Sequence, residues 1–392
     1  MSDLIVSDAA VETGTGAQTA AQTEALRVMN ICNACRYCEG LCATFQSMAR
    51  RRTFAAADMD YLANLCHNCT ACFHDCQYAP PHEFSVNVPV ALTAVRLESY
   101  QSYAWPRSLA GLFYRNGLVT FLTIALSLMG VLLAGAWLID PTKLFAVHVG
   151  EGAFYAVVPH SVMVAVAGIT FGFGILALTV SFSRFYRSLD KARFTLKQLP
   201  RALWQVATLK HLDGGTGEGC SSEHDGFSNE RRYFHQFTMW GFLLCFCSTV
   251  VATIYDYGFG LVAPYAVTSL PVLLGIFGGL GLLVGPLGLW RIKRRSDPRP
   301  MLKGQQGLDN AFLASLFLVS ATGFMVMLWR ETSAMGILLL IHLGFVLAFF
   351  VQLPFSKFVH GVYRFASLVR FSQEQLEEEQ KKEQKKEQKK ER

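Results

Sequence analysis

Two runs of four cysteines with the same spacing constrain this chain more than any other feature. Each run reads C-x2-C-x2-C-x3-C, and the runs are Cys32, Cys35, Cys38, Cys42 and Cys66, Cys69, Cys72, Cys76. This spacing is typical of proteins that bind two [4Fe–4S] clusters, in which the fourth cysteine of each run binds the other cluster. It predicts a first cluster on Cys32, Cys35, Cys38 and Cys76, and a second on Cys42, Cys66, Cys69 and Cys72. A protein with two such clusters transfers single electrons.

Zinc binding and disulfide bonding are the alternative interpretations of these cysteines. A zinc site usually takes four ligands in two pairs, which eight cysteines in two matching runs exceed. Disulfides belong to oxidising compartments and secreted chains. One departure from the ferredoxin pattern is visible, because Ala43 and Gln77 stand where proline usually follows the fourth cysteine.

The composition indicates a membrane protein with one soluble domain. Of 392 residues, 52% are hydrophobic and 16% charged, against about 25% charged in ordinary soluble domains. The deficit lies between Gly117 and Phe355. We therefore expect a soluble domain over residues 23–100 and a membrane domain over residues 101–365. The net charge of +6 reflects loops and tail, and no basic stripe with interleaved aromatics indicates nucleic-acid binding.

Six apolar segments reach the length of about 20 residues that a membrane helix needs. They are Gly117–Ile139, Val157–Phe182, Phe237–Tyr255, Tyr265–Trp290, Asn310–Trp329 and Met335–Phe355.

The charges of the loops predict the orientation of these helices. Loops 183–236 and 291–309 are rich in arginine and lysine, including Lys191 and Arg193, whereas the opposite loops carry only Lys143 and Arg330. The positive-inside rule then places both basic loops, both termini and the cluster domain in the cytoplasm. We expect a multi-pass protein of the bacterial inner membrane.

Both ends of the chain look unstructured. Residues 1–22 are small and polar and contain no apolar core of a signal peptide, so we expect a disordered tail there. Residues 366–392 end in a repetitive Glu-Gln-Lys segment that cannot bury a core. We expect a solvated helix or a disordered tail, with a partner-docking helix as the alternative.

The segment between the two cysteine runs favours helix. Residues 43–65 lack strand alternation, and Phe54, Met59, Leu62 and Leu65 recur near helical spacing. This looks like the α-helical ferredoxin domain of respiratory iron–sulfur subunits. The predicted fold is all-α: a ferredoxin domain with two [4Fe–4S] clusters followed by a six-helix transmembrane bundle.

Histidines near the predicted helices are candidate ligands of one or two b-type haems. They are His160, His235, His342 and His360. A bis-histidine haem takes one ligand from each of two facing helices. His342 and His360 are separated by about five helical turns, so both could face one side of one helix, roughly 27 Å apart.

The pairing of these histidines stays open at this point. His235 and His360 both lie at the inner membrane edge and make a plausible inner pair, which leaves His160 and His342 for an outer pair. Those two differ by roughly 13 Å in depth, and His148 is a substitute that lies further out. Arg231, Arg232 and Arg364 lie close to the inner histidines and either bind haem propionates or simply follow the positive-inside rule. No C-x-x-C-H motif indicates covalent haem.

Three segments carry a resemblance to a known family. They are CHNCTACFHDCQYAPPHEFSVNVP at 66–89, RRYFHQF at 231–237, and HLGF with LPFSKFVHGVYR inside 342–364. With them the chain resembles the tricarballylate-utilisation and citrate-utilisation B family from about Cys32 to Arg364. The resemblance implies a membrane cytochrome part similar to the nitrate reductase gamma subunit, joined to the cluster domain.

The resemblance also implies the partners. It points to a cytoplasmic FAD-dependent tricarballylate dehydrogenase that this protein reoxidises, with the electrons passing to the quinone pool. No dinucleotide fingerprint in a strand–helix context occurs in the chain, so the oxidoreductase label belongs to electron transfer alone. The alternative is a redox sensor or solute transporter with regulatory clusters, although we find no repeat between the first and last three helices.

Overall fold

The computed structural model describes residues 18–113, 116–189, 195–214, 217, 219–223 and 226–391. Most of the predicted N-terminal tail, residues 1–17, lies outside this part of the chain, as do Lys191 and Arg193. We expected residues 1–22 to be disordered, but helix α1 begins at Ala20. The side chain of Thr19 accepts a hydrogen bond from the backbone of Gln22 and so caps this helix.

The N-terminal domain consists of five helices around one core. They are α1 (Ala20–Cys35), α2 (Ala43–Ala49), α3 (Ala56–Leu65), α4 (Ala71–His74) and α5 (Val88–Ser102). The apolar spacing that predicted helix over 43–65 is confirmed as α2 and α3. Met29, Met48, Leu62 and Leu92 are fully buried between these helices. The core therefore holds α1, α3 and α5 together, and the segments that carry cysteines lie at the helix ends.

Within the described part of the chain, six helices are long and apolar enough to cross a membrane. They are α6 (Asn116–Leu138), α9 (His160–Ser188), α11 (Glu230–Phe259), α12 (Leu270–Arg295), α13 (Gln305–Leu328) and α14 (Met335–Gln352), the last continuing into the 3-10 turn η3 (Leu353–Phe355). The six predicted spans are confirmed, but α9, α11 and α12 extend beyond them into charged sequence. Hydropathy marks only the part of a helix that enters lipid, whereas backbone hydrogen bonding continues past it.

Glycines allow the closest helix pair of the bundle. Helices α11 and α12 approach so closely that a Cβ atom on Gly281 would lie 2.7 Å from the carbonyl oxygen of Phe237. A Cβ on Gly285 would lie 2.6 Å from the backbone nitrogen of Thr238. Small residues at such a crossing are the usual means of helix packing in membranes. The outward faces stay apolar, with Ile169, Phe121 and Phe277 among the most exposed side chains.

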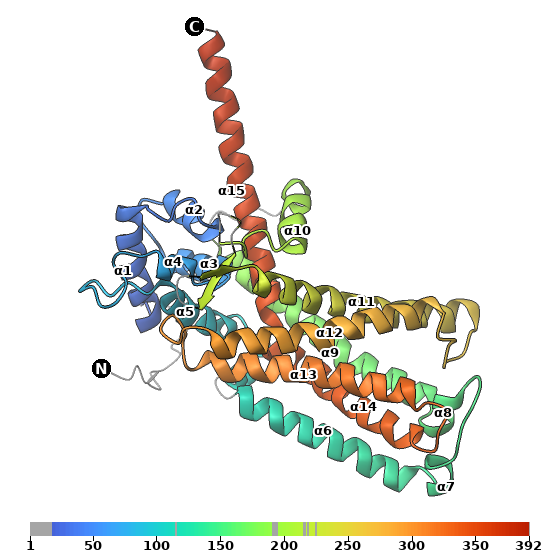
Figure 1. The fold of residues 1–392 in the computed structure, drawn as a ribbon. Coiled ribbons are helices and arrows are strands. Elements are labelled where there is room, and N and C mark those ends of the chain that lie inside the picture. The colour runs from blue at the N-terminus through green and yellow to red at the C-terminus, as the bar shows by residue number, and fades with distance from the viewer. Residues whose placement is uncertain are drawn as a thin grey trace.

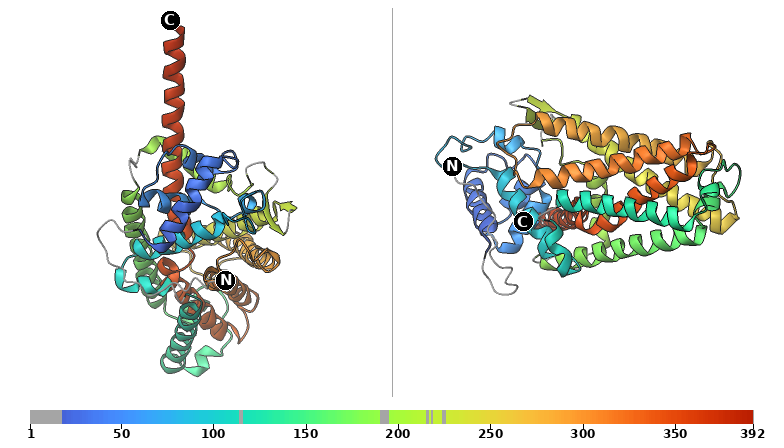
Figure 2. Two further views of the ribbon diagram at one scale, coloured as in Figure 1. Left: turned by 90° about the vertical axis from the view of Figure 1, so that its left-hand side faces the viewer. Right: turned by 90° about the horizontal axis from the view of Figure 1, so that it is seen from below.

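The N-terminal domain caps one end of the bundle, which we call the proximal end (Figures 1 and 2). Both basic loops lie there, since Asn87 donates to the carbonyl of Arg299 and Arg231 contacts the loop at Asn68. The remaining short elements are η1 (Arg107–Phe113), α7 (Pro141–Leu144), α8 (Ala153–Val157), η2 (Leu196–Gln198), α10 (Leu199–Ala207) and the hairpin β1 (Cys220–Glu223) with β2 (Gly226–Ser228). Helices α7 and α8 lie at the opposite, distal end of the bundle.

The last helix, α15 (Val359–Lys390), corrects two of our expectations. It runs across the proximal end of the bundle and then projects away from the molecule (Figure 1). His342 and His360 therefore do not share one helix, because the chain turns at η3, which contains Pro354. The predicted tail boundary at residue 366 is also wrong. Ala366, Leu368 and Phe371 are buried against the N-terminal domain and α10, and only the part from Glu379 onward is fully exposed.

Candidate functional site

The first cysteine set surrounds an open cavity in the N-terminal domain. Helix α1 ends at Cys35, and Arg36 follows in the left-handed backbone conformation with φ 55°. This turn returns the chain past Cys38 and brings it toward the end of α4. The resulting cavity has a volume of about 250 Å³ and is lined by Cys32, Cys35, Cys38 and Cys76. Three thiols of the first run and the last thiol of the second run thus share one cavity.

The second cysteine set surrounds a smaller and more enclosed cavity of about 20 Å³. Its lining includes Cys42, Cys66, Cys69 and Cys72. Cys66 directly follows α3, Asn68 and Thr70 take positive φ angles, and Cys72 lies in α4. Two lining residues, His211 and Gly214, come from the segment that follows α10. The second cavity is therefore closed partly by the membrane domain.

The electrostatic environment of the thiols follows the same grouping. Burial, and then the charges of Cys38, Cys76 and Cys35, raise the pKa of Cys32 to about 12. Burial, and then the charges of Cys69 and Cys66, raise the pKa of Cys42 to about 12. The charges that act on Cys32 and on Cys42 thus include thiols from the other cysteine run. Raised pKa values mean that these thiols keep their protons until a metal displaces them.

The residues present fit two iron–sulfur clusters. Four thiols around one cavity are the donor set of a [4Fe–4S] cluster. The first set fits such a cluster in both its four thiols and the volume of its cavity. The second set fits it in its four thiols. Within the described residues, no group of three or more Cys, His, Asp or Glu side chains is placed to hold a single metal ion. The assignment of these eight cysteines as ligands stays a prediction.

Two arginines of the membrane domain hold the loop of the second set. Arg231 of α11 donates to the carbonyl oxygens of Asn68 and, at 3.2 Å, of His67. Arg364 of α15 donates to the carbonyl oxygen of Cys66 at 2.9 Å. Both therefore act on the cysteine loop, a contact that the sequence did not predict.

The third arginine of that group, Arg232, acts elsewhere. Its guanidinium donates to the carbonyl oxygen of Thr208, at the end of α10, at 2.9 and 3.2 Å. The neighbouring Gln236 donates to the carbonyl of Ala207 at 3.2 Å. Together these bonds fix α10 and the following segment, including His211, against the first turns of α11.

The structure brings His235 and His360 together at the proximal end of the bundle. Their ring centroids lie 6.1 Å apart at an interplanar angle of 75°. Two imidazoles bound to opposite sides of one metal at about 2 Å per bond have centroids roughly 6 Å apart. Nδ1 of His360 contacts the carbonyl of Lys357, which leaves Nε2 for another partner. Among the described residues, Nδ1 of His235 is buried without a hydrogen-bond partner. This pair fits a bis-histidine haem.

The structure does not bring His160 and His342 together. His160 begins α9 at the distal end, where Nε2 lies 3.3 Å from a carboxylate oxygen of Asp256 and the ring packs 4.7 Å from Tyr155. Nδ1 of His342 lies 3.1 Å from the hydroxyl of Thr322 on α13. The two rings thus face different helices, so the described geometry does not fit the expected outer pair. His148 contacts the carbonyl of Lys143.

Two side chains beside the second set lie outside the predicted ligand sets. His211 lies with its ring 6.3 Å from that of His67, and burial lowers its pKa to about 4. Cys220 of β1 is buried and packs against Cys69. Neither residue stands in a motif, and both come from a loop more than 130 positions away in the sequence. Only the tertiary structure shows that they lie beside the second set.

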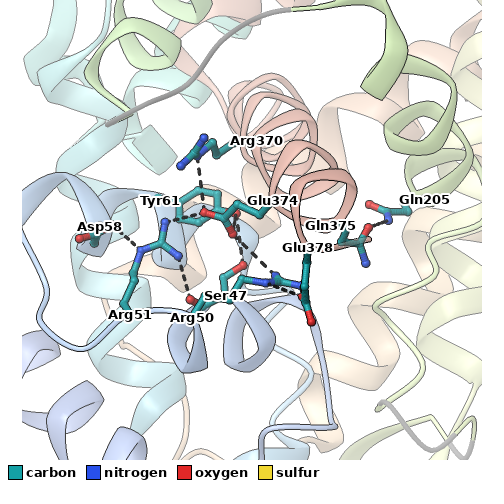
Figure 3. A network of polar contacts seen from close by, with 10 residues as sticks. All are labelled: Ser47, Arg50, Arg51, Asp58, Tyr61, Gln205, Arg370, Glu374, Gln375 and Glu378. Atoms are coloured by element: carbon teal, nitrogen blue, oxygen red, sulfur yellow. Dashed lines mark hydrogen bonds and ion pairs between the residues drawn. The ribbon is translucent and has the colours of Figure 1, made fainter. Parts of the chain in front are cut away.

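A network of polar contacts fastens α15 to the N-terminal domain (Figure 3). Glu374 is buried and accepts hydrogen bonds from Arg51 at 2.7 Å and from the hydroxyl of Tyr61 at 3.1 Å. Arg51 also donates to Asp58, and Gln205 of α10 donates to Gln375. Because α15 also carries His360 and Arg364, this network fixes the cysteine loops relative to the histidine pair.

Comparisons with known proteins agree across both domains. The family model described as citrate utilization protein B matches residues 114–383, and the model of the citrate utilization protein B Fer4-like domain matches residues 25–102. A curated citrate utilization protein B from Escherichia coli is 45% identical over 363 residues, covering 91% of this chain and 93% of the relative. No solved structure gives a significant match.

Proposed function

This chain belongs to the citrate utilization protein B family, and from that premise we propose that it reoxidises a reduced FAD-dependent tricarballylate dehydrogenase and passes the electrons to the quinone pool. The family, the Fer4-like domain and the six apolar helices fit a membrane iron–sulfur electron-transfer role in citrate or tricarballylate utilisation. The flavoprotein, its tricarboxylate substrate and the quinone are the finer part of the proposal.

One observation carries the proposal: the N-terminal domain, which packs on the membrane bundle, has two cavities, each lined by cysteines from both runs. When bound, two [4Fe–4S] clusters supply one-electron carriers. The chain's own part is to hold eight thiols around two cavities in a helical core. Arg231 and Arg364 keep the second cavity against the bundle. Substrate dehydrogenation is assigned to the flavoprotein.

We assign His235 and His360 to one b-type haem at the proximal end. The centroid separation and the unpartnered Nδ1 of His235 support this assignment. The position also supports it, since His67 beside the second set and Arg364 both lie close enough to act electrostatically on His235. The pair therefore lies on the side of the membrane domain that faces the second cysteine loop.

We place the N-terminal domain and both basic loops in the cytoplasm and the bundle in the bacterial inner membrane. The location of Arg231, Arg299 and the last turn of α12, with Lys293, Arg294 and Arg295, at the proximal end supports this orientation. The flavoprotein would then meet the N-terminal domain in the compartment where it is made.

The test is an anaerobic reconstitution. The purified protein in liposomes that contain a quinone is mixed with the dehydrogenase previously reduced by tricarballylate. Reoxidation of the flavin with stoichiometric quinol formation, dependent on this protein, is the expected result. A dehydrogenase that stays reduced, while dithionite still bleaches the iron–sulfur absorbance, would remove the flavoprotein from the proposal.

A further inference from the structure

The two cysteine sets differ in what surrounds them. Every residue that lines the first cavity lies between Ile31 and Val86, within the N-terminal domain. Cys35 is exposed, and the neighbouring Tyr37 is 74% exposed. Helix α1, which ends beside this cavity, lies on the side of the N-terminal domain away from the six long helices (Figures 1 and 2). A soluble protein can therefore approach the first set directly.

The second set faces the membrane domain instead. His211 and Gly214 line its cavity, and Arg231 and Arg364 donate to its loop. None of its four cysteines is exposed. A donor protein could reach the second set only by displacing these contacts. The second set is placed to hand electrons on to the bundle and the His235–His360 pair.

We propose that the first cysteine set is where this protein takes electrons from its soluble flavoprotein, and that the flavoprotein docks on the exposed surface around Tyr37. The inference rests on the proposed function and adds the direction and the contact surface. The reduced FAD loses two electrons and two protons. The electrons pass to this protein one at a time and the protons go to solvent, and one quinone takes up two electrons and two protons to become quinol.

The Tyr37 face, as we call this surface, consists of Ala34, Cys35, Arg36, Tyr37, Glu39 and Phe84. Phe84 is 46% exposed, and its ring packs 5.6 Å from that of Tyr78, which lines the first cavity. Arg27 donates to the carbonyl of Phe84 at 2.9 Å and so holds this loop against α1, while Tyr37 and Tyr78 both line the first cavity. Exposed aromatic side chains with arginine nearby are typical of the centres of protein interfaces.

The first experiment tests the contact surface. Tyr37→Ser and Phe84→Ser are compared with wild type in stopped-flow bleaching of the iron–sulfur absorbance, once by the tricarballylate-reduced dehydrogenase and once by dithionite. We expect the KM for the dehydrogenase to rise about tenfold in each variant and the dithionite reaction to stay unchanged. The control is Trp204→Ser on α10, an exposed aromatic outside the Tyr37 face, which should behave as wild type.

The second experiment tests the direction by freeze-quench electron paramagnetic resonance. In Cys69→Ala, the dehydrogenase should reduce the first cluster at the wild-type rate. In Cys35→Ala, the second cluster should stay oxidised on that time scale although dithionite reduces it. Wild-type KM values in both surface variants, or rapid reduction of the second cluster in Cys35→Ala, would overturn the inference. A dehydrogenase that reduces neither cluster of the wild type would overturn the proposed function itself.

Discussion

Glu374 of α15 and Arg51 of the N-terminal domain form a hydrogen-bonded ion pair at 2.7 Å, although 323 positions separate them in the sequence. The carboxylate is buried and also accepts from Tyr61. We expect Glu374→Ala to destabilise the docked N-terminal domain by about 1–3 kcal/mol, because Arg51 keeps only Asp58 as a carboxylate partner and the buried hydroxyl of Tyr61 loses an acceptor. The check is the temperature at which the iron–sulfur absorbance disappears. Glu379→Ala, at an exposed pair with Arg201, is the control and should change little.

Truncation distinguishes the buried and exposed parts of α15. A chain that stops after Gln380 keeps Phe371 and Glu374 and should assemble normally. A chain that stops after Phe365 loses the buried residues Leu368 and Phe371 as well as Glu374, so its N-terminal domain should become sensitive to limited proteolysis. Equal protease resistance of the two chains would contradict the role given to α15.

The histidine pair predicts the haem content. His235→Ala and His360→Ala should each remove the b-type band from the dithionite-reduced minus oxidised spectrum, since each takes away one axial ligand. His160→Ala and His342→Ala should leave that band, because their rings face Asp256 and Thr322. A spectrum without haem bands in wild type would refute the haem assignment and leave the cysteine sites untouched.

Of the two clusters, Arg364 should tune only the second. A cation beside Cys66 stabilises the more negative, reduced state, so Arg364→Ala should lower the midpoint potential of the second cluster by on the order of tens of millivolts. Arg364→Lys keeps the charge and should shift the potential less. A redox titration monitored by electron paramagnetic resonance gives the midpoint potentials of both clusters. An equal shift in the midpoint potential of the first cluster would indicate that the substitution disturbs the whole N-terminal domain.

Asp60 predicts a pH dependence of stability. Burial raises the pKa of its carboxyl to about 6, in spite of hydrogen bonds from Tyr103 and Gln22. The folded state therefore binds this proton more tightly than the unfolded state. The resulting stabilisation is complete below the unfolded pKa, about 4, and is lost as the pH rises through 6.

Comparison of wild type with Asp60→Asn isolates that contribution. Going from pH 7 to pH 5 should stabilise wild type by about 1 kcal/mol relative to Asp60→Asn, as measured by chemical denaturation of the N-terminal domain. The same pH profile in both proteins would show that Asp60 titrates normally.

The sequence by itself determined the features that depend on local periodicity. The apolar runs predicted six long helices, and the spacing between Phe54 and Leu65 predicted helix in the N-terminal domain. The crossed grouping of cysteines could be predicted because, in proteins with this spacing and two clusters, the fourth cysteine of each run binds the other cluster. Helical hydrogen bonds and side-chain periodicity involve residues that are close in the sequence, so short stretches of sequence suffice to predict the helices.

The tertiary structure alone decided the contacts between distant segments. The residues of α15 before Glu379 look like a solvated tail, yet Phe371 and Glu374 are buried because the N-terminal domain supplies Arg51 and Tyr61 as partners. The break at η3 separates His342 from His360, and the loop after α10 brings His211 beside His67. Such contacts depend on how helices dock in space, and no spacing along the chain encodes which distant side chain will satisfy a buried charge.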